Sequence, residues 1–218
     1  MRRPTGINRR GSTLGAQVSG RRAGQRFDAE RGVLTEALMF LGDLDPEAIG
    51  SSLAHATHYE ATPVADFGRL IGHVPFALEH ATFIDLGAGM GRVILLAAMR
   101  PFRQVVGVEL SPALTAIARG NLRSAPRDAF RCRDVRMVCA DAAAYRFPRG
   151  PLVVYLYNPF DAAVLTPIAA RLAARRCPLA LLYHTPVQRE VIEALAAFEL
   201  VAEESCGVVY QLARREQR

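Results

Sequence analysis

The residues best suited to bind a ligand lie in one glycine-rich stretch, ATFIDLGAGMGRVILLAA, at positions 81–98. Gly87, Gly89 and Gly91 alternate with other residues between an apolar run and a helical pattern, and Asp85 stands two positions before the first glycine. Glycines adopt positive φ readily and let a ligand touch the backbone. A loop of this composition between a strand and a helix predicts a binding site for a nucleotide-like cofactor.

The glycine spacing and the charge of Asp85 argue against a dinucleotide cofactor. The fingerprint G-x-G-x-x-G requires its third glycine at position 92, where this chain has Arg92. A carboxylate at the tip of the strand would also repel a pyrophosphate. Asp85 instead suits a cationic ligand such as S-adenosylmethionine, which carries a sulfonium and an ammonium and no phosphate. An NAD(P)-dependent oxidoreductase is the weaker alternative.

Alternating strand and helix patterns after residue 82 predict a doubly wound α/β sheet that carries this loop. Short apolar strands are expected at 83–86, 105–109, 135–139, 152–157 and 179–183, and helices at 92–99, 111–121, 161–175 and 185–197. Ser111, Asp161 and Thr185 are predicted N-caps. The stretch FELVAEESCGVVYQLAR predicts two strands joined by a tight turn at 205–207. The result is a mostly parallel, Rossmann-like sheet that ends in an antiparallel hairpin.

The chain before this sheet is divided into two segments by its composition. Residues 1–25 are rich in Gly, Ser and Arg without apolar periodicity, which predicts a disordered basic tail. Residues 26–62 are expected to form an N-terminal cap segment, and residues 63–218 the cofactor-binding domain. At the boundary, Thr62 is a predicted N-cap and Pro63 the first helical residue.

The charge of the chain raises nucleic acid as a partner without requiring it. The net charge is +6, and all 27 basic residues are arginine. A compositional bias of the genome would replace lysine with arginine in the same way, and eight of the arginines fall in residues 1–31. Nucleic acid is therefore a possible partner, but it is not the one that the sequence favours.

The cysteines and the hydropathy pattern favour a cytoplasmic protein. The four cysteines form no C-x-x-C pair, and no histidine stands at metal-ligand spacing beside them, so no metal site is predicted. Reduced thiols in a reducing compartment are expected instead. No segment has the length of a membrane span, and the N-terminus has no apolar core of a secretory signal, so no membrane association is expected.

Four motifs resemble those of the class I S-adenosylmethionine-dependent methyltransferases: DLGAGMGR, VVGVELS, CADA and YLYNPFD. The resemblance covers about residues 59–213 and implies S-adenosyl-L-methionine as cofactor and the seven-stranded methyltransferase form of the sheet. More narrowly, DLGxGxGR, GVELSP and YLYNPF are similar to a bacterial group whose substrates are mostly unassigned. That group usually has Y-x-P-T-P before its core, and this chain has Ala61 in place of the first proline.

The resemblance and the spacing together assign roles to several cofactor-binding residues. Glu109 ends the second strand, 22 residues after Gly87, where a carboxylate can accept both ribose hydroxyls. Asp141 is expected to accept the adenine amino group, with the Ala142 amide beside the ring, although a turn-forming aspartate would leave the same pattern. Asp85 is expected to hold the methionine ammonium directly or through water. The predicted cofactor-binding residues are Tyr59, Thr62, Asp85, Gly87, Ala88, Gly89, Glu109, Leu110, Asp141, Ala142 and Asn158.

The methyl acceptor is expected beside Asn158, Pro159 and Phe160. In amino-directed methyltransferases the matching place often reads N/D/S-P-P-Y/F, so the resemblance implies that Asn158 is a catalytic residue that aligns a nitrogen acceptor. A protein lysine or a small-molecule amine is favoured. An asparagine followed by proline is also a common turn opening. A non-catalytic S-adenosylmethionine-binding protein and an O-methyltransferase of a small metabolite are the alternatives, and His184 is either a base or a residue of the rim.

Overall fold

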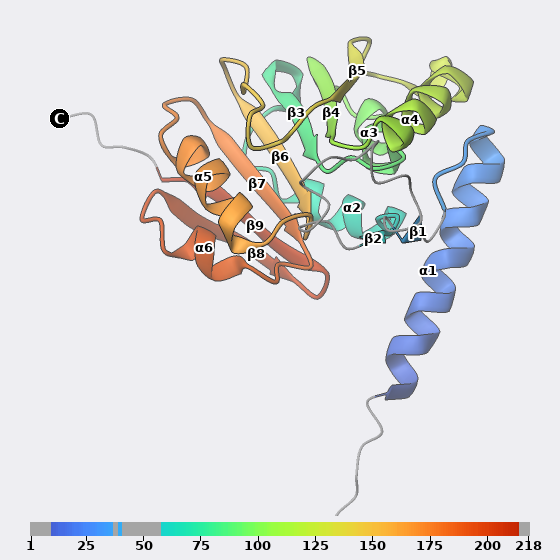
Figure 1. Ribbon diagram of the computed structural model, residues 1–218, viewed down its shortest axis with the longest axis horizontal. Helices are drawn as coiled ribbons and strands as arrows, with labels where there is room; N and C mark the ends of the chain where they lie inside the picture. Colours follow the sequence, from blue (N-terminus) through green and yellow to red (C-terminus); the bar gives the residue numbers. More distant parts are fainter. Residues whose placement is uncertain (1–9, 37–38, 41–57, 214–218) are drawn as a thin grey trace, which may run out of the picture.

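A central sheet of seven strands organises the chain, as Figure 1 shows for the computed structural model, which describes residues 10–36, 39–40 and 58–213. The strand order is β5-β4-β3-β6-β7-β9-β8. The strands are β3 (Thr82–Leu86), β4 (Gln104–Glu109), β5 (Val135–Cys139), β6 (Leu152–Tyr157), β7 (Leu179–His184), β8 (Phe198–Glu204) and β9 (Gly207–Leu212). The first five are parallel, and β9 runs antiparallel to β7 and β8. The predicted fold class is thus confirmed, including the C-terminal hairpin.

Helices cover both faces of this sheet (Figure 1). They are α2 (Val64–Gly72), α3 (Arg92–Ala98), α4 (Pro112–Ser124), α5 (Ala162–Ala173) and α6 (Arg189–Glu193), with short 3₁₀ turns at Leu78–His80 and Arg127–Ala129. Phe83 and Val105 pack in the core formed with α2, α3 and α4, whereas Ile84 and Val106 pack in the core formed with α5 and α6. Burial on both faces explains why the inner strands are nearly uninterrupted apolar runs. Among the described helices, none combines the length and the apolarity that a membrane crossing needs.

Two predicted helix starts are confirmed, and two are wrong. The side chain of Ser111 accepts a hydrogen bond from the Leu114 amide, and that of Asp161 accepts one from the Val164 amide. Thr62 does not cap α2, because the N-cap is Pro63 and the Thr62 hydroxyl is bonded elsewhere. Thr185 does not begin a helix either, because α6 starts only at Arg189.

Residues 10–25 of the predicted disordered tail are helical, and residues 1–9 lie outside the described part of the chain. Helix α1 spans Arg10–Arg31 and extends away from the body of the domain, with its last turns against it (Figure 1). Phe27 and Asp28 are buried there, and Phe27 belongs to the core beside α2 and α3. These long-range contacts, absent from any local pattern, fix the end of the helix. After α1 the described residues before residue 60 are the short segment 32–36 and a pair of two-residue antiparallel strands, β1 (Met39–Phe40) and β2 (His58–Tyr59).

The strand order places the glycine loop at a switch point of the sheet. From β3 the chain crosses to β4 on one side, and it later returns to place β6 on the other side. Because β3 and β6 are parallel neighbours, the loop after Leu86 and the loop after Tyr157 leave the same edge of the sheet side by side. Open α/β sheets bind ligands at such a point, outside the carboxyl ends of the strands.

Candidate functional site

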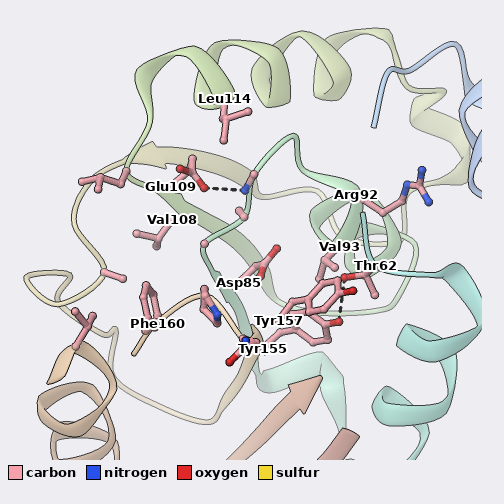
Figure 2. A pocket seen from close by; sticks show the side chains of 18 of the residues that line it. Thr62, Asp85, Arg92, Val93, Val108, Glu109, Leu114, Tyr155, Tyr157 and Phe160 are labelled. Carbon is pink, nitrogen blue, oxygen red and sulfur yellow. Dashed lines mark hydrogen bonds between the residues drawn. The ribbon is translucent and has the colours of Figure 1, made fainter. Parts of the chain in front are cut away.

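A cavity of about 300 Å³ opens at the carboxyl ends of β3, β4 and β6, and Figure 2 shows the side chains around it. The predicted site residues that line it are Thr62, Asp85, Gly87, Ala88, Gly89, Glu109, Leu110, Asp141, Ala142 and Asn158. The side chain of the remaining one, Tyr59, lies outside the part of the chain whose side chains the structure describes. The cavity thus brings together predicted site residues that are up to 96 positions apart, from Thr62 to Asn158.

The glycine loop needs glycine for its backbone shape and for space. Gly87, Gly89 and Gly91 have φ values of 82°, 52° and 86°, in the left-handed region where a side chain is strained. A Cβ atom on Gly87 would also stand 2.8 Å from Cβ of Pro159. The loop therefore turns sharply under the cavity and touches the loop that follows β6.

Glu109 is a buried carboxylate that the backbone holds in place. Oε2 accepts the amide of Gly89 at 2.8 Å (Figure 2), and Oε1 accepts the amide of Ser111 at 2.8 Å. Burial raises the pKa of this carboxyl, while the amides of Ser111, Gly89 and Leu110 lower it. Because each carboxylate oxygen has two acceptor sites, both oxygens retain capacity for a further donor, such as a pair of ribose hydroxyls.

Asp85 is buried at the cavity wall with no partner of its own. Its residue is 3% exposed, and among the described residues no donor lies within hydrogen-bond distance of its carboxylate. Burial raises the pKa of Asp85 well above its ordinary value, and the nearby Glu109 carboxylate raises it further. An isolated buried carboxylate is costly, so this wall of the cavity favours a cationic ligand group.

Thr62 and Asp141 both line the cavity while serving local structure. The Thr62 Oγ1 atom lies 3.0 Å from the Tyr155 hydroxyl, a buried hydrogen bond that replaces the predicted N-cap (Figure 2). Asp141 Oδ1 accepts the Ala143 amide at 2.8 Å, which is the turn geometry that the sequence left as an alternative. Ala142, which lies within this turn, also lines the cavity.

Two residues of the cavity wall have a strained backbone. Asn158 has φ 39° and Thr185 has φ 48°, and both line the cavity. A left-handed asparagine is common, whereas a left-handed β-branched residue is a genuine outlier. Such strain costs about 1–3 kcal/mol and clusters at functional sites. Sequence patterns did not identify Thr185 as a site residue, because its Thr-Pro pair is typical of a helix start.

Aromatic residues also line the cavity: Tyr155 and Tyr157 from β6, and Phe160 from the loop that follows it (Figure 2). Phe160 was predicted to lie beside the acceptor, whereas neither tyrosine was assigned to the site. The Tyr183 hydroxyl stands 3.5 Å from Oδ1 of Asn158, which leaves that amide oxygen only weakly engaged. The Asn158 side chain can therefore accept a donor from a bound substrate.

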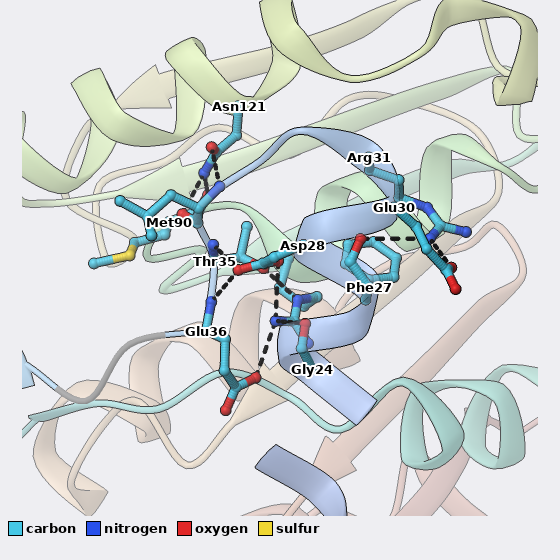
Figure 3. Close-up of polar contacts among 11 residues, drawn as sticks. Gly24, Phe27, Asp28, Glu30, Arg31, Thr35, Glu36, Met90 and Asn121 are labelled. Carbon is cyan, nitrogen blue, oxygen red and sulfur yellow. Dashed lines mark hydrogen bonds and ion pairs between the residues drawn. The ribbon is translucent and has the colours of Figure 1, made fainter. Parts of the chain in front are cut away.

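Arg92 ties the glycine loop to the N-terminal helix. The Arg92 side chain is 2% exposed, lines the cavity and lies over the ring of Phe27. Its guanidinium donates to Thr35 Oγ1 and to the Gly24 carbonyl, and it pairs with two carboxylates, Asp28 at 3.3 Å and Glu36 at 3.0 Å (Figure 3). The sequence identified Arg92 only as a missing glycine, since none of these partners is near it in the chain.

Residues 83–175 match the family model described as "Methyltransferase domain". A curated relative, the tRNA1(Val) (adenine(37)-N6)-methyltransferase of Shewanella sp. (strain MR-4), is 35% identical over 81 residues. That match covers 35% of this chain, and the chain spans only 34% of the relative.

Solved methyltransferases share the fold. The glycopeptide N-methyltransferase MtfA complexed with sinefungin gives a TM-score of 0.54 at 14% identity, over 72% of this chain and 88% of that one. The 23S rRNA methyltransferase ErmE gives a TM-score of 0.50 at 15% identity, over 69% of this chain and 68% of that one. Residues 83–175 are thus similar to known methyltransferase domains, and the solved methyltransferases share the fold of the sheet that carries the glycine loop.

Proposed function

We propose that the protein binds S-adenosylmethionine in the cavity and transfers its methyl group to a nitrogen atom of an acceptor. The observation that carries this proposal is that the cavity contains two buried carboxylates with different surroundings. Glu109 is held by backbone amides and has acceptor capacity left, and Asp85 has no partner among the described residues. Ribose hydroxyls would satisfy the first, and the ammonium of the methionine part would satisfy the second.

The cofactor supplies an electrophilic methyl group on a sulfonium, and the chain contributes binding and alignment. Gly87 and Gly89 let the ligand approach the backbone, while Leu110 and Ala142 form apolar walls. Asn158 accepts an N–H of the acceptor and aims the nitrogen lone pair at the methyl group. Such positioning of two reactants can supply about 7–11 kcal/mol of barrier lowering.

The amino group of a nucleobase becomes the first acceptor to test. The sequence alone favoured a protein lysine or a small-molecule amine, with nucleic acid behind them. The curated relative is by name a tRNA adenine N6-methyltransferase, which reverses that order. Phe160 beside Asn158 offers a ring on which a flipped base can stack, and the net charge of +6 favours a polyanionic substrate.

Methyl-labelled S-adenosylmethionine with separate pools of tRNA, rRNA, proteins and small amines tests the acceptor. We expect label in an RNA pool, and an N-methylated base after digestion to nucleosides. Label on a lysine or a small amine would retain the nitrogen chemistry and change the substrate. Label on a hydroxyl or carboxylate oxygen would refute the nitrogen assignment, and binding without labelling of any pool would leave a cofactor-binding protein without catalysis.

A further inference from the structure

A hydrogen-bonded chain of three side chains runs from the cavity wall into the protein behind it. Thr185 Oγ1 lies 3.1 Å from Nδ1 of His184, and Nε2 of His184 lies 3.2 Å from Oδ2 of Asp66 on α2. We call these three residues the Thr185 triad. Thr185 lines the cavity, His184 is 4% exposed, and Asp66 reaches the surface with 19% of its side chain.

The backbone pins Thr185 in the position that makes this chain possible. Its amide donates to the Cys206 carbonyl at 2.9 Å, in the turn between β8 and β9. Gly207 packs so closely behind it that a Cβ there would stand 2.4 Å from the Tyr183 carbonyl oxygen. The antiparallel hairpin thus holds Thr185 at its left-handed φ of 48°, in the cavity wall and with its hydroxyl beside His184.

The partners of His184 define one proton arrangement. A carboxylate can only accept, so the contact with Asp66 places the ring proton on Nε2. Nδ1 then accepts the proton of the Thr185 hydroxyl. The Tyr157 hydroxyl is a further hydrogen-bond partner of this side chain, and one lone pair of Thr185 Oγ1 is left for a donor in the cavity. The same order of acid, imidazole and hydroxyl activates hydroxyl groups in hydrolases.

The reaction proposed above releases a proton that some group must accept. The acceptor nitrogen forms its bond to the methyl carbon, and the electron pair of the breaking carbon–sulfur bond stays on sulfur. The methylated nitrogen is then cationic and must lose an N–H proton. Among the described carboxylates that line the cavity, Asp85, Glu109 and Asp141 are already assigned to the cofactor, and Glu60 is exposed and hydrogen-bonded to Tyr157.

We infer that the Thr185 triad is the proton acceptor of this site, an inference that rests on the proposed methyl transfer. The nitrogen gives its proton to Thr185 Oγ1 while the Thr185 hydroxyl proton moves to Nδ1 of His184. The imidazolium that forms is stabilised by the Asp66 carboxylate. After the product leaves, the proton returns through Thr185 to water, so that Nδ1 is free again. Thr185 also lines a second, more open cavity beside Cys206, which offers a route for that water.

The surroundings of His184 suit a neutral imidazole that can accept a proton. Burial lowers the pKa of His184, while the hydrogen bond and charge of Asp66 and the charge of Glu60 oppose that shift. The Tyr157 ring packs edge-on against the His184 ring, with 4.2 Å between the ring centroids, and Arg69 forms an ion pair with Asp66 at 2.9 Å. Since the pKa of His184 is below its ordinary value, the imidazole stays uncharged at neutral pH. The rate should fall only as the pH decreases through that lowered pKa.

The same side chains suggest a metal site as the competing explanation. One ligand atom each from Asp66, His184 and Cys206 lies within 4.8 Å of the other two. Arg69 argues against a cation there, because its guanidinium already occupies Oδ1 of Asp66. Zinc bound at one equivalent by the wild type, and lost in His184→Gln, would overturn the triad.

Two measurements test the triad. The first is NMR of the full chain labelled with ¹⁵N-histidine, in which the His184 signals are identified by their loss in His184→Gln. These signals should show a neutral ring protonated on Nε2, and protonation on Nδ1 would overturn the arrangement.

The second measurement is turnover. Thr185→Val should lower kcat by about 10²–10⁴-fold with little change in affinity for S-adenosylmethionine, and it should abolish the acidic limb of the pH–rate profile. Thr185→Ser, which restores the hydroxyl, should recover most of the loss, and Thr166→Val on the exposed side of α5 is the matched control.

The outcomes separate the triad from the proposed function. If the wild type methylates an acceptor and Thr185→Val has the same rate and the same pH profile, the role of the triad is refuted and the proposed function stands. A wild type that binds S-adenosylmethionine and methylates nothing would remove the proposed function, and the triad's role with it.

Discussion

At the scale of single residues, Asp85 should make cofactor binding depend on pH. Its pKa is raised by burial and by Glu109, so the free protein takes up a proton there in a range where an exposed aspartate is charged. Only the carboxylate can pair with an ammonium, so affinity for S-adenosylmethionine should fall as the pH decreases through that raised pKa. Calorimetry in two buffers with different heats of ionisation should detect one proton released on binding.

The variant Asp85→Asn supplies the control for this behaviour. It mimics the protonated carboxyl, so it should bind more weakly and lose the pH dependence. The buried charge also destabilises the free protein as the pH rises through the raised pKa, so Asp85→Asn should raise the unfolding temperature near neutral pH. A wild type whose affinity and proton release are constant with pH would show that Asp85 does not contact the ammonium.

Asn158 should contribute to turnover and little to cofactor affinity. Its amide oxygen is weakly engaged and faces the cavity, so removing it should disorient the acceptor and lower kcat by about 10²-fold. Asn158→Gly is the informative variant, because glycine keeps the φ of 39° without strain and removes only the side chain. Turnover and calorimetry are measured together. Wild-type turnover in Asn158→Gly would reduce the Asn-Pro-Phe stretch to a structural turn.

At the scale of elements, α1 should stabilise the glycine loop through Asp28. The Asp28 carboxylate accepts the amides of Thr35 and Glu36 at 2.6 Å each and pairs with buried Arg92 (Figure 3). Removing one partner of a buried ion pair costs about 3–5 kcal/mol, so Asp28→Ala should lower the free energy of unfolding by that order. Asp128→Ala, at an exposed turn, is the control. Equal denaturation midpoints for the two variants would contradict the role of α1.

Truncation separates the part of α1 that matters from the part that does not. A chain that starts at residue 20 keeps Gly24, Phe27 and Asp28 and should bind S-adenosylmethionine like the full protein. A chain that starts at residue 37 leaves Arg92 buried without the partners that surround it, and it should lose both stability and affinity. Calorimetry on both chains checks this. Full affinity in the shorter chain would show that α1 is dispensable for the site.

Local sequence patterns predicted the elements better than the contacts between them. The five parallel strands lie within one residue of their predicted bounds, because buried strands are apolar runs that end at polar site residues. The helical state of α1 and the role of Arg92 could not be predicted, because their partners are distant in the chain. Thr185 was misassigned for a different reason: the close approach of Gly207 overrides its preference for a helix N-cap.

At the scale of the whole molecule, the arginine content should make any nucleic-acid substrate bind in a salt-dependent way. The net charge of +6 comes from 27 arginines against 21 acidic residues. Each phosphate that a basic residue neutralises releases counterions, so affinity for tRNA should fall steeply between low and moderate salt. Filter binding at several salt concentrations measures the slope. Absence of tRNA binding at low salt would return a protein lysine or a small amine to the first place among acceptors.

The central claim is that this cavity holds S-adenosylmethionine, and calorimetry on the full chain tests it most directly. We expect one molecule of S-adenosylmethionine or S-adenosylhomocysteine to bind per chain and NAD not to bind. Glu109→Ala should weaken binding by about 1.5–3 kcal/mol, roughly tenfold to 150-fold, because the ribose hydroxyls lose a charged acceptor. Glu79→Ala, at an exposed carboxylate, should bind as the wild type does. No heat with S-adenosylmethionine, or equal affinities for Glu109→Ala and Glu79→Ala, would contradict the account.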